Sequence, residues 1–447
     1  MYFRQIYIFI ITVSILLTGC QKLVNDPGNS ATDGGTSDEG LNYWGGTYND
    51  EGHALEQTKD GGYIVAGSQF NSTNNEDLYI VKFDSDLNID NEKIHAGSET
   101  TTDVTNAYLT YTSSATDVKQ TADGGYITVG NTYNGTDFDV WVVKFLPDLT
   151  PHWEAIISTG AGENDWGNSI QEMYSGKFVI CGTSYDKTNQ DYDIIVWTVE
   201  WDGTIATSLA VFSDTNAAGA TNTTNDYGHQ ASQTHDGGLI IVGTQGTDMA
   251  VIKLISDGAA GTFSKDTAFS DDTDNSADDG DGHILIDTGN IDEGTYIEQQ
   301  DDFSYIIAGN TEAGTGHQSN VYVNTISKFG VAGTTPAVLV GEYDDKITCI
   351  VQTSDGGFVF TGSKYNGDSH ADVWAVKLNA SLSVHWNFTY GGHLDDIGEE
   401  IAQTFDGGYI ITGSTMSYGN QSEIVLLKLK PDGTVDNIIG QLSTSGN

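Results

Sequence analysis

The chain has 447 residues and a formal net charge of −46 at pH 7, with 63 acidic side chains against 17 basic ones. Arg4 is its only arginine. Such a chain offers no basic patch to phosphate groups, which excludes nucleic acid as a partner and disfavours anionic ligands. Cations, neutral glycans and basic proteins remain as ligand classes.

Residues 1–19 are typical of an export signal. The apolar stretch at residues 6–17 is too short to span a bilayer as a mature helix. It leads into LTGC, which resembles the bacterial lipobox, and this resemblance implies cleavage before Cys20 and acylation of its thiol. Residues 20–40 are rich in Asn, Asp, Gly, Ser and Thr, which predicts a flexible tether that begins at the lipidated cysteine.

The export signal predicts where the protein acts. The membrane is an expected partner through the lipid on Cys20, and the expected location is the cell envelope, in the outer membrane or at the cell surface. A plain secretory signal, without acylation, is the alternative.

One phrase recurs seven times between residues 41 and 440. In its clearest copies Asp-Gly-Gly joins two apolar runs, as in QTKDGGYIVAG from Gln57. The turn position recurs about every 58 residues, at Asp60, Asp123, Ser175, Asp236, Asp302, Asp355 and Asp406. The copies with Ser175 and Asp302 lack Gly-Gly. This period indicates an array of units, each of which needs its neighbours to bury its apolar surface.

Each unit is predicted to contain four strands. Asp-Gly between alternating apolar runs predicts a hairpin, because Gly accepts the positive φ of a tight turn. A third run follows, such as DVWVVKF from Asp139, and then a fourth, such as HWEAII from His152. The expected fold is all-β, a seven-bladed β-propeller with four antiparallel strands per blade, at residues 41–440, followed by a tail at 441–447. Which terminus supplies the closing outer strand is left open.

A lysine ends the third apolar run in five of the seven repeats. These are Lys82, Lys144, Lys253, Lys377 and Lys428. A lysine that recurs in a lysine-poor chain implies a recurring partner, and the turn acids are the nearest candidates. The sequence therefore predicts one structural ion pair in each of these blades.

A carboxylate also recurs ten residues before the turn acid. The set is Asp50, Asp165, Asp226, Asp292, Asp345 and Asp396, and the second repeat has Ser113 instead. In a propeller this segment leads into the inner strand, so we expect these six ring acids around one mouth of the channel. Two interpretations are open. The ring binds a cation, with calcium as the usual ion for all-oxygen ligands, or each Asp caps a repeated Asx turn.

A second acid-rich segment lies at residues 270–287. Its candidate metal ligands are Asp272, Asp274, Asp278 and Asp281. The segment resembles a calcium loop only in part, since no register places both Gly and Glu where an EF-hand needs them, and a solvated acidic insertion is the alternative.

Insertions also precede the inner strands of repeats two and four. We expect function on the face that these insertions share with the ring acids.

The repeat resembles the β-propeller repeat of bacterial secreted and surface lipoproteins. The resemblance rests on GGHLDDIG from Gly391, followed by DGGY from Asp406. It covers about residues 44–439, and it implies the propeller fold and export but little chemistry.

Residue supply argues against familiar enzymes. Sialidase-type propellers bind the carboxylate of their substrate with several arginines, and this chain has only Arg4, in the predicted signal. The sequence also contains no G-x-S-x-G, H-E-x-x-H or Walker motif. We therefore predict no catalytic residues and no enzyme, but a lipid-anchored envelope module that binds or scaffolds a glycan or protein ligand on its loop face, with calcium as the candidate cofactor. The alternative is a carbohydrate-active enzyme that acts on a neutral polysaccharide through paired carboxylates. His53, His229 and His393, near the ring acids, leave a metal-assisted hydrolase open.

Overall fold

The structure is a computed structural model, and it describes residues 33–36, 42–45, 48–70, 76–95, 113–188, 190–212, 224–257, 263–270, 282–313, 318–339, 343–365, 370–418 and 421–436. Three predictions lie outside these residues: lipidation at Cys20, the tail at 441–447, and the calcium loop of Asp272, Asp274, Asp278 and Asp281. No helix long and apolar enough to cross a membrane occurs in the described part of the chain.

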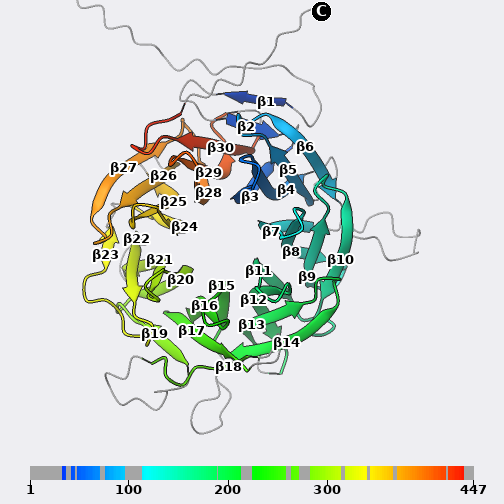
Figure 1. Cartoon of the computed structure of the whole chain (residues 1–447), viewed down its shortest axis with the longest axis vertical. Helices are drawn as coiled ribbons and strands as arrows, with labels where there is room; N and C mark the ends of the chain where they lie inside the picture. The colour runs from blue at the N-terminus through cyan, green and yellow to red at the C-terminus, as the bar shows by residue number, and fades with distance from the viewer. Residues whose placement is uncertain are drawn as a thin grey trace, which may run out of the picture.

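Seven antiparallel sheets are arranged around a common axis, as the repeats predict, and the region along this axis is called the channel below (Figure 1). Blade one contains β3 (Asp50–Gln57), β4 (Tyr63–Phe70), β5 (Glu76–Phe83) and β6 (Ile89–His95). Blade two contains β7 (Ser113–Gln120), β8 (Tyr126–Tyr133), β9 (Phe138–Phe145) and β10 (Pro151–Ile157). Blade three contains β11 (Asp165–Glu172), β12 (Phe178–Asp186), β13 (Asp191–Val199) and β14 (Ile205–Phe212).

The second half of the ring repeats this order. Blade four contains β15 (Asp226–Gln233), β16 (Leu239–Gln245), β17 (Asp248–Ser256), β18 (Phe263–Lys265) and β19 (His283–Ile286). Blade five contains β20 (Ile291–Gln299), β21 (Tyr305–Ala313), β22 (Gln318–Ile326) and β23 (Ala337–Leu339). Blade six contains β24 (Lys346–Gln352), β25 (Phe358–Tyr365), β26 (Ala371–Leu378) and β27 (Val384–Tyr390). Blade seven contains β28 (Asp396–Gln403), β29 (Tyr409–Thr415) and β30 (Glu423–Leu429).

The N-terminal segment closes the ring. β2 (Asn42–Gly45) pairs with β30 and supplies the fourth strand of blade seven, while β1 (Asp33–Thr36) adds a fifth strand outside it. Trp44 lies 4.9 Å from Phe83 of blade one, between ring centroids, so the closing strand also contacts the first blade. Residues 33–36, which we expected in the tether, thus form a strand, because the free edge of β2 offers backbone partners without requiring apolar side chains.

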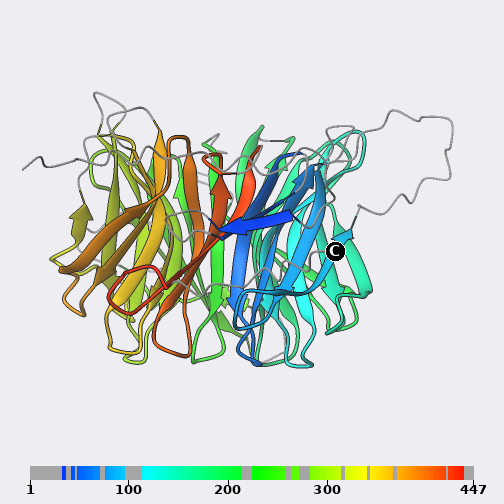
Figure 2. The same cartoon turned by 90° about the horizontal axis from the view of Figure 1, so that it is seen from above.

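The first strand of each blade lines the channel and the fourth lies at the rim (Figure 1). Figure 2 shows the ring from its edge, with the strands running between two faces. The Asp-Gly-Gly turns lie on one face of the ring, which we call the turn face. The inner strands begin at the opposite face, which we call the loop face. Residues 283–286, which we expected in an insertion, instead pair with β17 as β19, so blade four divides its outer strand between two short segments.

The middle strands of each blade are buried on both sides, because each blade lies between two others. All eight residues of β4 but the last are buried, which explains the uninterrupted apolar runs of the sequence. One core cluster joins Ile64 and Ile80 of blade one to Trp141 and Val143 of blade two. Contacts of this kind between consecutive blades hold the ring together.

The turn lysines have the predicted partners. Each Nζ lies 3.0–3.1 Å from a carboxylate oxygen of the turn acid in its own blade. The pairs are Lys82–Asp60, Lys144–Asp123, Lys253–Asp236, Lys377–Asp355 and Lys428–Asp406. The lysines are buried and the carboxylates are more than half exposed, so these pairs fasten the hairpin at the edge of the core.

Candidate ligand-binding site at the channel mouth

The six ring acids lie at equivalent positions, at the loop-face end of six of the seven inner strands, and Ser113 has this position in β7. Each side chain is at most 1% exposed. Asp165 accepts hydrogen bonds from the backbone N–H of Thr159 at 2.7 Å and from its hydroxyl at 2.8 Å. Asp292 accepts the same two bonds from Thr288, both at 2.7 Å. The carboxylates of Asp165 and Asp292 therefore point into the loops that precede their own strands rather than into open solvent.

Other ring acids also have partners within their own blades. Asp396 accepts bonds from the N–H of Gly392 and the hydroxyl of Ser417, both at 2.7 Å. Asp345 pairs with Lys364 at 3.0 Å. Burial raises the pKa of Asp165 and of Asp396, although their hydroxyl donors oppose the shift. Such contacts are those of turn caps, and cation binding by the ring stays a prediction.

Two groups of three carboxylates come close enough to share an ion. In each group the ligand oxygens lie within 4.8 Å of one another. One group is Asp248, Asp287 and Asp292, and the other is Asp186, Asp191 and Asp193. Only Asp292 belongs to the predicted ring, so the structure groups it with acids that we did not select.

The side chains that do face the channel are those one and three residues after the ring acids. In β11, Asp165 and Gly167 are buried whereas Trp166 and Asn168 are partly exposed, as strand alternation requires. The register shifts beside Asn168 and beside His229, so each is the extra residue of a β-bulge, a feature that redirects a side chain. These residues of four consecutive blades converge at the loop face.

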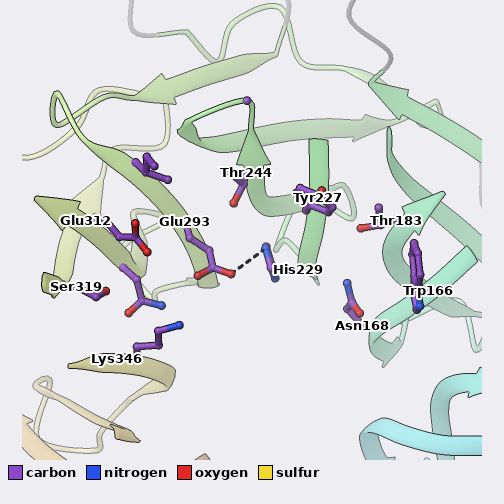
Figure 3. Close-up of a pocket in the computed structure, with 13 residues that line it drawn as sticks. Trp166, Asn168, Thr183, Tyr227, His229, Thr244, Glu293, Glu312, Ser319 and Lys346 are labelled. Atoms are coloured by element: carbon purple, nitrogen blue, oxygen red, sulfur yellow. Dashed lines mark ion pairs between the residues drawn. The ribbon is translucent and has the colours of Figure 1, made fainter. Parts of the chain in front are cut away.

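They line a pocket of about 620 Å³ that spans blades three to six (Figure 3). Its aromatic wall is formed by Trp166 and Tyr227, and Tyr192 lies between them, with ring centroids 5.4 Å from Trp166 and 5.7 Å from Tyr227. Trp166 and Tyr192 are partly exposed, and Tyr227 is exposed. The pocket thus offers flat apolar faces to a ligand at the channel mouth.

The opposite wall is polar. It contains the two carboxylates Glu293 and Glu312, the amide of Asn310, and Lys346. Asn310 is held in place by blade six, since its Oδ1 accepts the N–H of Ile347 at 2.9 Å. Its Nδ2 also donates to the carbonyl oxygen of Ile347 at 3.3 Å, so this amide fixes the wall, and Glu293, Glu312 and Lys346 are the charged groups that the wall offers to a ligand.

His229 lies at the centre of the pocket, between the two walls (Figure 3). Its Nε2 is 3.7 Å from Oε1 of Glu293, which is longer than a hydrogen bond. Burial lowers the pKa of His229, and the Glu293 carboxylate opposes this shift only in part. The imidazole is therefore neutral at pH 7 and available as an acceptor or a base.

The other two histidines that we selected lie elsewhere. His53 Nε2 is 3.9 Å from Glu51 Oε2 in blade one, and burial lowers the pKa of His53 too. His393 is exposed in the loop before β28. The sequence placed all three beside ring acids, but it did not show which blades would contribute to one pocket.

A charged cluster deeper in the channel was not anticipated. Lys119 Nζ lies 2.7 Å from Asp117 Oδ1 and 3.3 Å from Glu400 Oε1, so it bridges blades two and seven across blade one. Burial raises the pKa of Glu400 to about 7, and burial with the charge of Glu51 raises that of Glu399 to about 7. Charged residues at alternate positions of the inner strands were the signal that could have revealed this cluster.

Comparison with known proteins supports the fold. A family model described as "Domain of unknown function (DUF5122) beta-propeller" matches residues 406–437, in blade seven. No curated protein matches the chain in sequence.

Among solved structures, three illustrate the range of similarity. Polysaccharide lyase Uly1 is 8% identical with a TM-score of 0.51, over 85% of this chain and 90% of that one. YCF48 from Cyanidioschyzon merolae is 8% identical with a TM-score of 0.47, over 85% and 96% of the chains. Endo-arabinase from Bacteroides thetaiotaomicron VPI-5482 is 11% identical with a TM-score of 0.32, over 58% and 92%.

These similarities correct one prediction. We predicted that the protein is not an enzyme because familiar catalytic motifs are missing. Propellers of similar fold include a polysaccharide lyase, so that inference is wrong for this fold, although 8% identity shows the fold alone. The chain is thus a β-propeller by its structure and by the family model over blade seven, and its relation to surface lipoproteins stays a prediction.

Proposed function

We propose that the protein is a lipid-anchored propeller of the cell envelope that binds a neutral glycan in the channel-mouth pocket. One observation supports this most directly: the aromatic wall of Trp166 and Tyr227 faces a wall that carries the carboxylates of Glu293 and Glu312 and the amine of Lys346. Aromatic faces pack against the C–H faces of sugar rings, while carboxylates and amines bind sugar hydroxyls. The charge of −46 disfavours acidic sugars.

The test is a binding screen against neutral glycans with the full chain carrying Cys20→Ser, which retains the closing strands but removes the acylation site. The screen is run with calcium and with a chelator, because the proposed calcium cofactor would make binding depend on the ion. Trp166→Ala should weaken glycan binding roughly thirtyfold, the effect of removing a central aromatic anchor worth about 2 kcal/mol.

The matched control is Trp201→Ala. The Trp201 side chain is 70% exposed and lies outside the pocket, so its removal should leave glycan binding unchanged. Failure of every neutral glycan to bind the folded chain would refute the proposed function. Equal binding by the Trp166→Ala and wild-type chains would move the site elsewhere.

The anchor is tested separately. Cys20→Ser should abolish fatty-acid labelling and release the protein from the membrane fraction. Labelling that persists in this variant would contradict the lipoprotein proposal without affecting the glycan site.

Turnover of the bound glycan is a second candidate function. It is favoured by the neutral His229, 3.7 Å from Glu293, with Glu312 as a second carboxylate in the same pocket. Release of new sugar ends by the wild-type chain, lost in His229→Gln while glycan binding persists, would establish it. Binding without any release of product would leave the binding function alone.

A further inference from the structure

The aromatic wall of the pocket is one end of a longer series of rings. We infer that the ligand is a linear glycan chain, which lies along the loop face from blade two to blade four and ends in the pocket. This inference rests on the proposed function and specifies the length and path of its ligand.

The series, called here the aromatic run, consists of Tyr133, Phe138, Trp166, Tyr192 and Tyr227. Successive ring centroids lie 5.1, 6.4, 5.4 and 5.7 Å apart. Tyr227 is exposed and the other four side chains are partly exposed. Each step is comparable to the length of one sugar unit in an extended chain, so the five rings can accommodate about five units, one beside each ring.

The fold does not require aromatic residues at these positions. Tyr133 and Phe138 are paired at the end of the β8–β9 hairpin. The Thr132–Asp139 pair of blade two corresponds to the Gln245–Asp248 pair of blade four, so the residues of blade four equivalent to Tyr133 and Phe138 are Gly246 and Thr247. The positions of Trp166 and Tyr227 in the inner strands are occupied by Glu293 in blade five and Lys346 in blade six. Because these blades form without aromatic residues at the same places, the contiguous aromatic residues of blades two to four point to a ligand.

The negative charge of the chain indicates that the ligand is not a polyanion. The run ends in the pocket beside Glu293 and Glu312, and the whole chain carries 63 acidic side chains, so a polyanion would be repelled along this path. A neutral polysaccharide offers repeated C–H faces to successive rings and repeated hydroxyls to the polar wall. An extended peptide is the alternative occupant, and the test distinguishes it.

The experiment measures calorimetric binding of the full chain carrying Cys20→Ser to defined oligosaccharides of increasing length. The probes are β-1,4-gluco-, β-1,4-xylo-, β-1,3-gluco- and α-1,4-gluco-oligosaccharides from the monosaccharide to the hexasaccharide, together with an uncharged extended peptide. We expect the affinity for one of these series to rise with each added unit and to level off at about five units.

Phe138→Ala tests the distant end of the aromatic run. Its removal should weaken binding of the longest oligosaccharides about tenfold and leave binding of the disaccharide unchanged, because short ligands occupy the pocket alone. Phe138→Tyr should restore the wild-type affinity. Tyr365→Ala is the control: it removes an aromatic ring from the same end of the hairpin in blade six, at the position equivalent to Tyr133, and should have no effect.

The outcomes separate the inference from the proposed function. Equal affinity for disaccharide and hexasaccharide, with Phe138→Ala inert, would overturn the extended path and leave the pocket as a glycan site. Binding of the peptide but of no oligosaccharide would overturn both. Thermal melting of each variant verifies that it is folded, and the retained disaccharide affinity of Phe138→Ala provides an internal check.

Discussion

The buried side chain of Lys82 limits which residue can occupy the second glycine position of the turn. A Cβ on Gly62 would lie 2.4 Å from Lys82 Nζ and 2.2 Å from the carbonyl oxygen of Phe83, so the second turn glycine leaves the space that the lysine occupies. The two blades without this glycine have Lys177 and Ser304 in its place, and they have no lysine at the end of the third strand. They have Thr198 and Thr325 there instead.

We therefore expect Gly62→Ala to lower the free energy of unfolding by about 3 kcal/mol, since it inserts a methyl group against a backbone carbonyl. Gly61→Ala is the matched control. Gly61 has a φ of +88° with nothing within 4 Å of an added Cβ. Gly61→Ala should therefore lower the free energy of unfolding by only about 1–2 kcal/mol, through backbone strain. Chemical denaturation measures both. A cost for Gly61→Ala equal to or above that of Gly62→Ala would contradict the steric argument.

The same coupling predicts a non-additive pair. Combining Gly62→Ala with Lys82→Thr removes the Nζ clash, and it places Thr opposite a residue other than Gly, as in the two degenerate blades. The double variant should be more stable than the sum of the single effects by at least about 0.5 kcal/mol in the same denaturation experiment. Strict additivity would show that the two positions do not interact.

At the scale of the element, the inner strand ends in a residue that joins two blades. Gln57 Oε1 accepts the backbone N–H of Phe405 at 2.8 Å, across the closure between blades one and seven. Gln120 accepts the N–H of Lys59 at 2.9 Å in the same way. The repeated QT phrase revealed a strand and a turn, but the reason for its glutamine is visible only once the ring is closed.

Replacing Gln57 by Ala should lower the free energy of unfolding by about 1 kcal/mol, the net value of one hydrogen bond. Gln57→Glu retains a hydrogen-bond acceptor, and it should lower the free energy of unfolding by less than Gln57→Ala does. Blade three has a glutamate at this position, since Glu172 accepts the N–H of Ala122 at 2.7 Å. Denaturation curves compare the two. A larger loss for the Glu variant would show that the acceptor is not what matters.

The closing strands give a second prediction at this scale. Deleting residues 1–32 should leave the melting temperature unchanged, whereas deleting residues 1–46 should lower it sharply and promote association. The longer deletion exposes the edge of β30 and removes Trp44 from Phe83, and an unpaired edge strand is a template for other chains. Melting curves and light scattering test this. Equal behaviour of the two deletions would mean that β2 does not close the ring.

At the scale of the whole molecule, the sequence predicted the ring but not its asymmetry. The count of seven blades followed from the turn period, and the inner strands began where the ring acids indicated. The pocket could not be predicted in this way, because it combines Trp166, Tyr227 and Glu293 from three repeats that differ from one another at the same position. The repeats identify the propeller, but only the structure shows which of the residues that differ between repeats lie next to one another.

The last prediction concerns the pH dependence of the whole ring. The Thr353 hydroxyl, the Gly357 N–H and Lys377 lower the pKa of Asp355 to about 2, so this turn stabilises the fold above the ordinary value of 3.8 and loses that stabilisation as the pH falls toward 2. Glu399 behaves in the opposite sense. Burial raises its pKa from 4.5 to about 7, so the stabilisation is fully present below pH 4.5 and is lost as the pH rises through 7.

The melting temperature should therefore be highest between about pH 4 and 5 and decline toward both pH 2 and pH 8. Glu399→Gln cannot ionise, so it should reduce the decline between pH 5 and pH 8 relative to the wild-type chain. Asp90→Asn, which removes one charge from an exposed position, controls for the general repulsion within so acidic a chain. If both variants reduce the decline equally, net charge rather than the channel carboxylate determines it, and the role assigned to Glu399 is wrong.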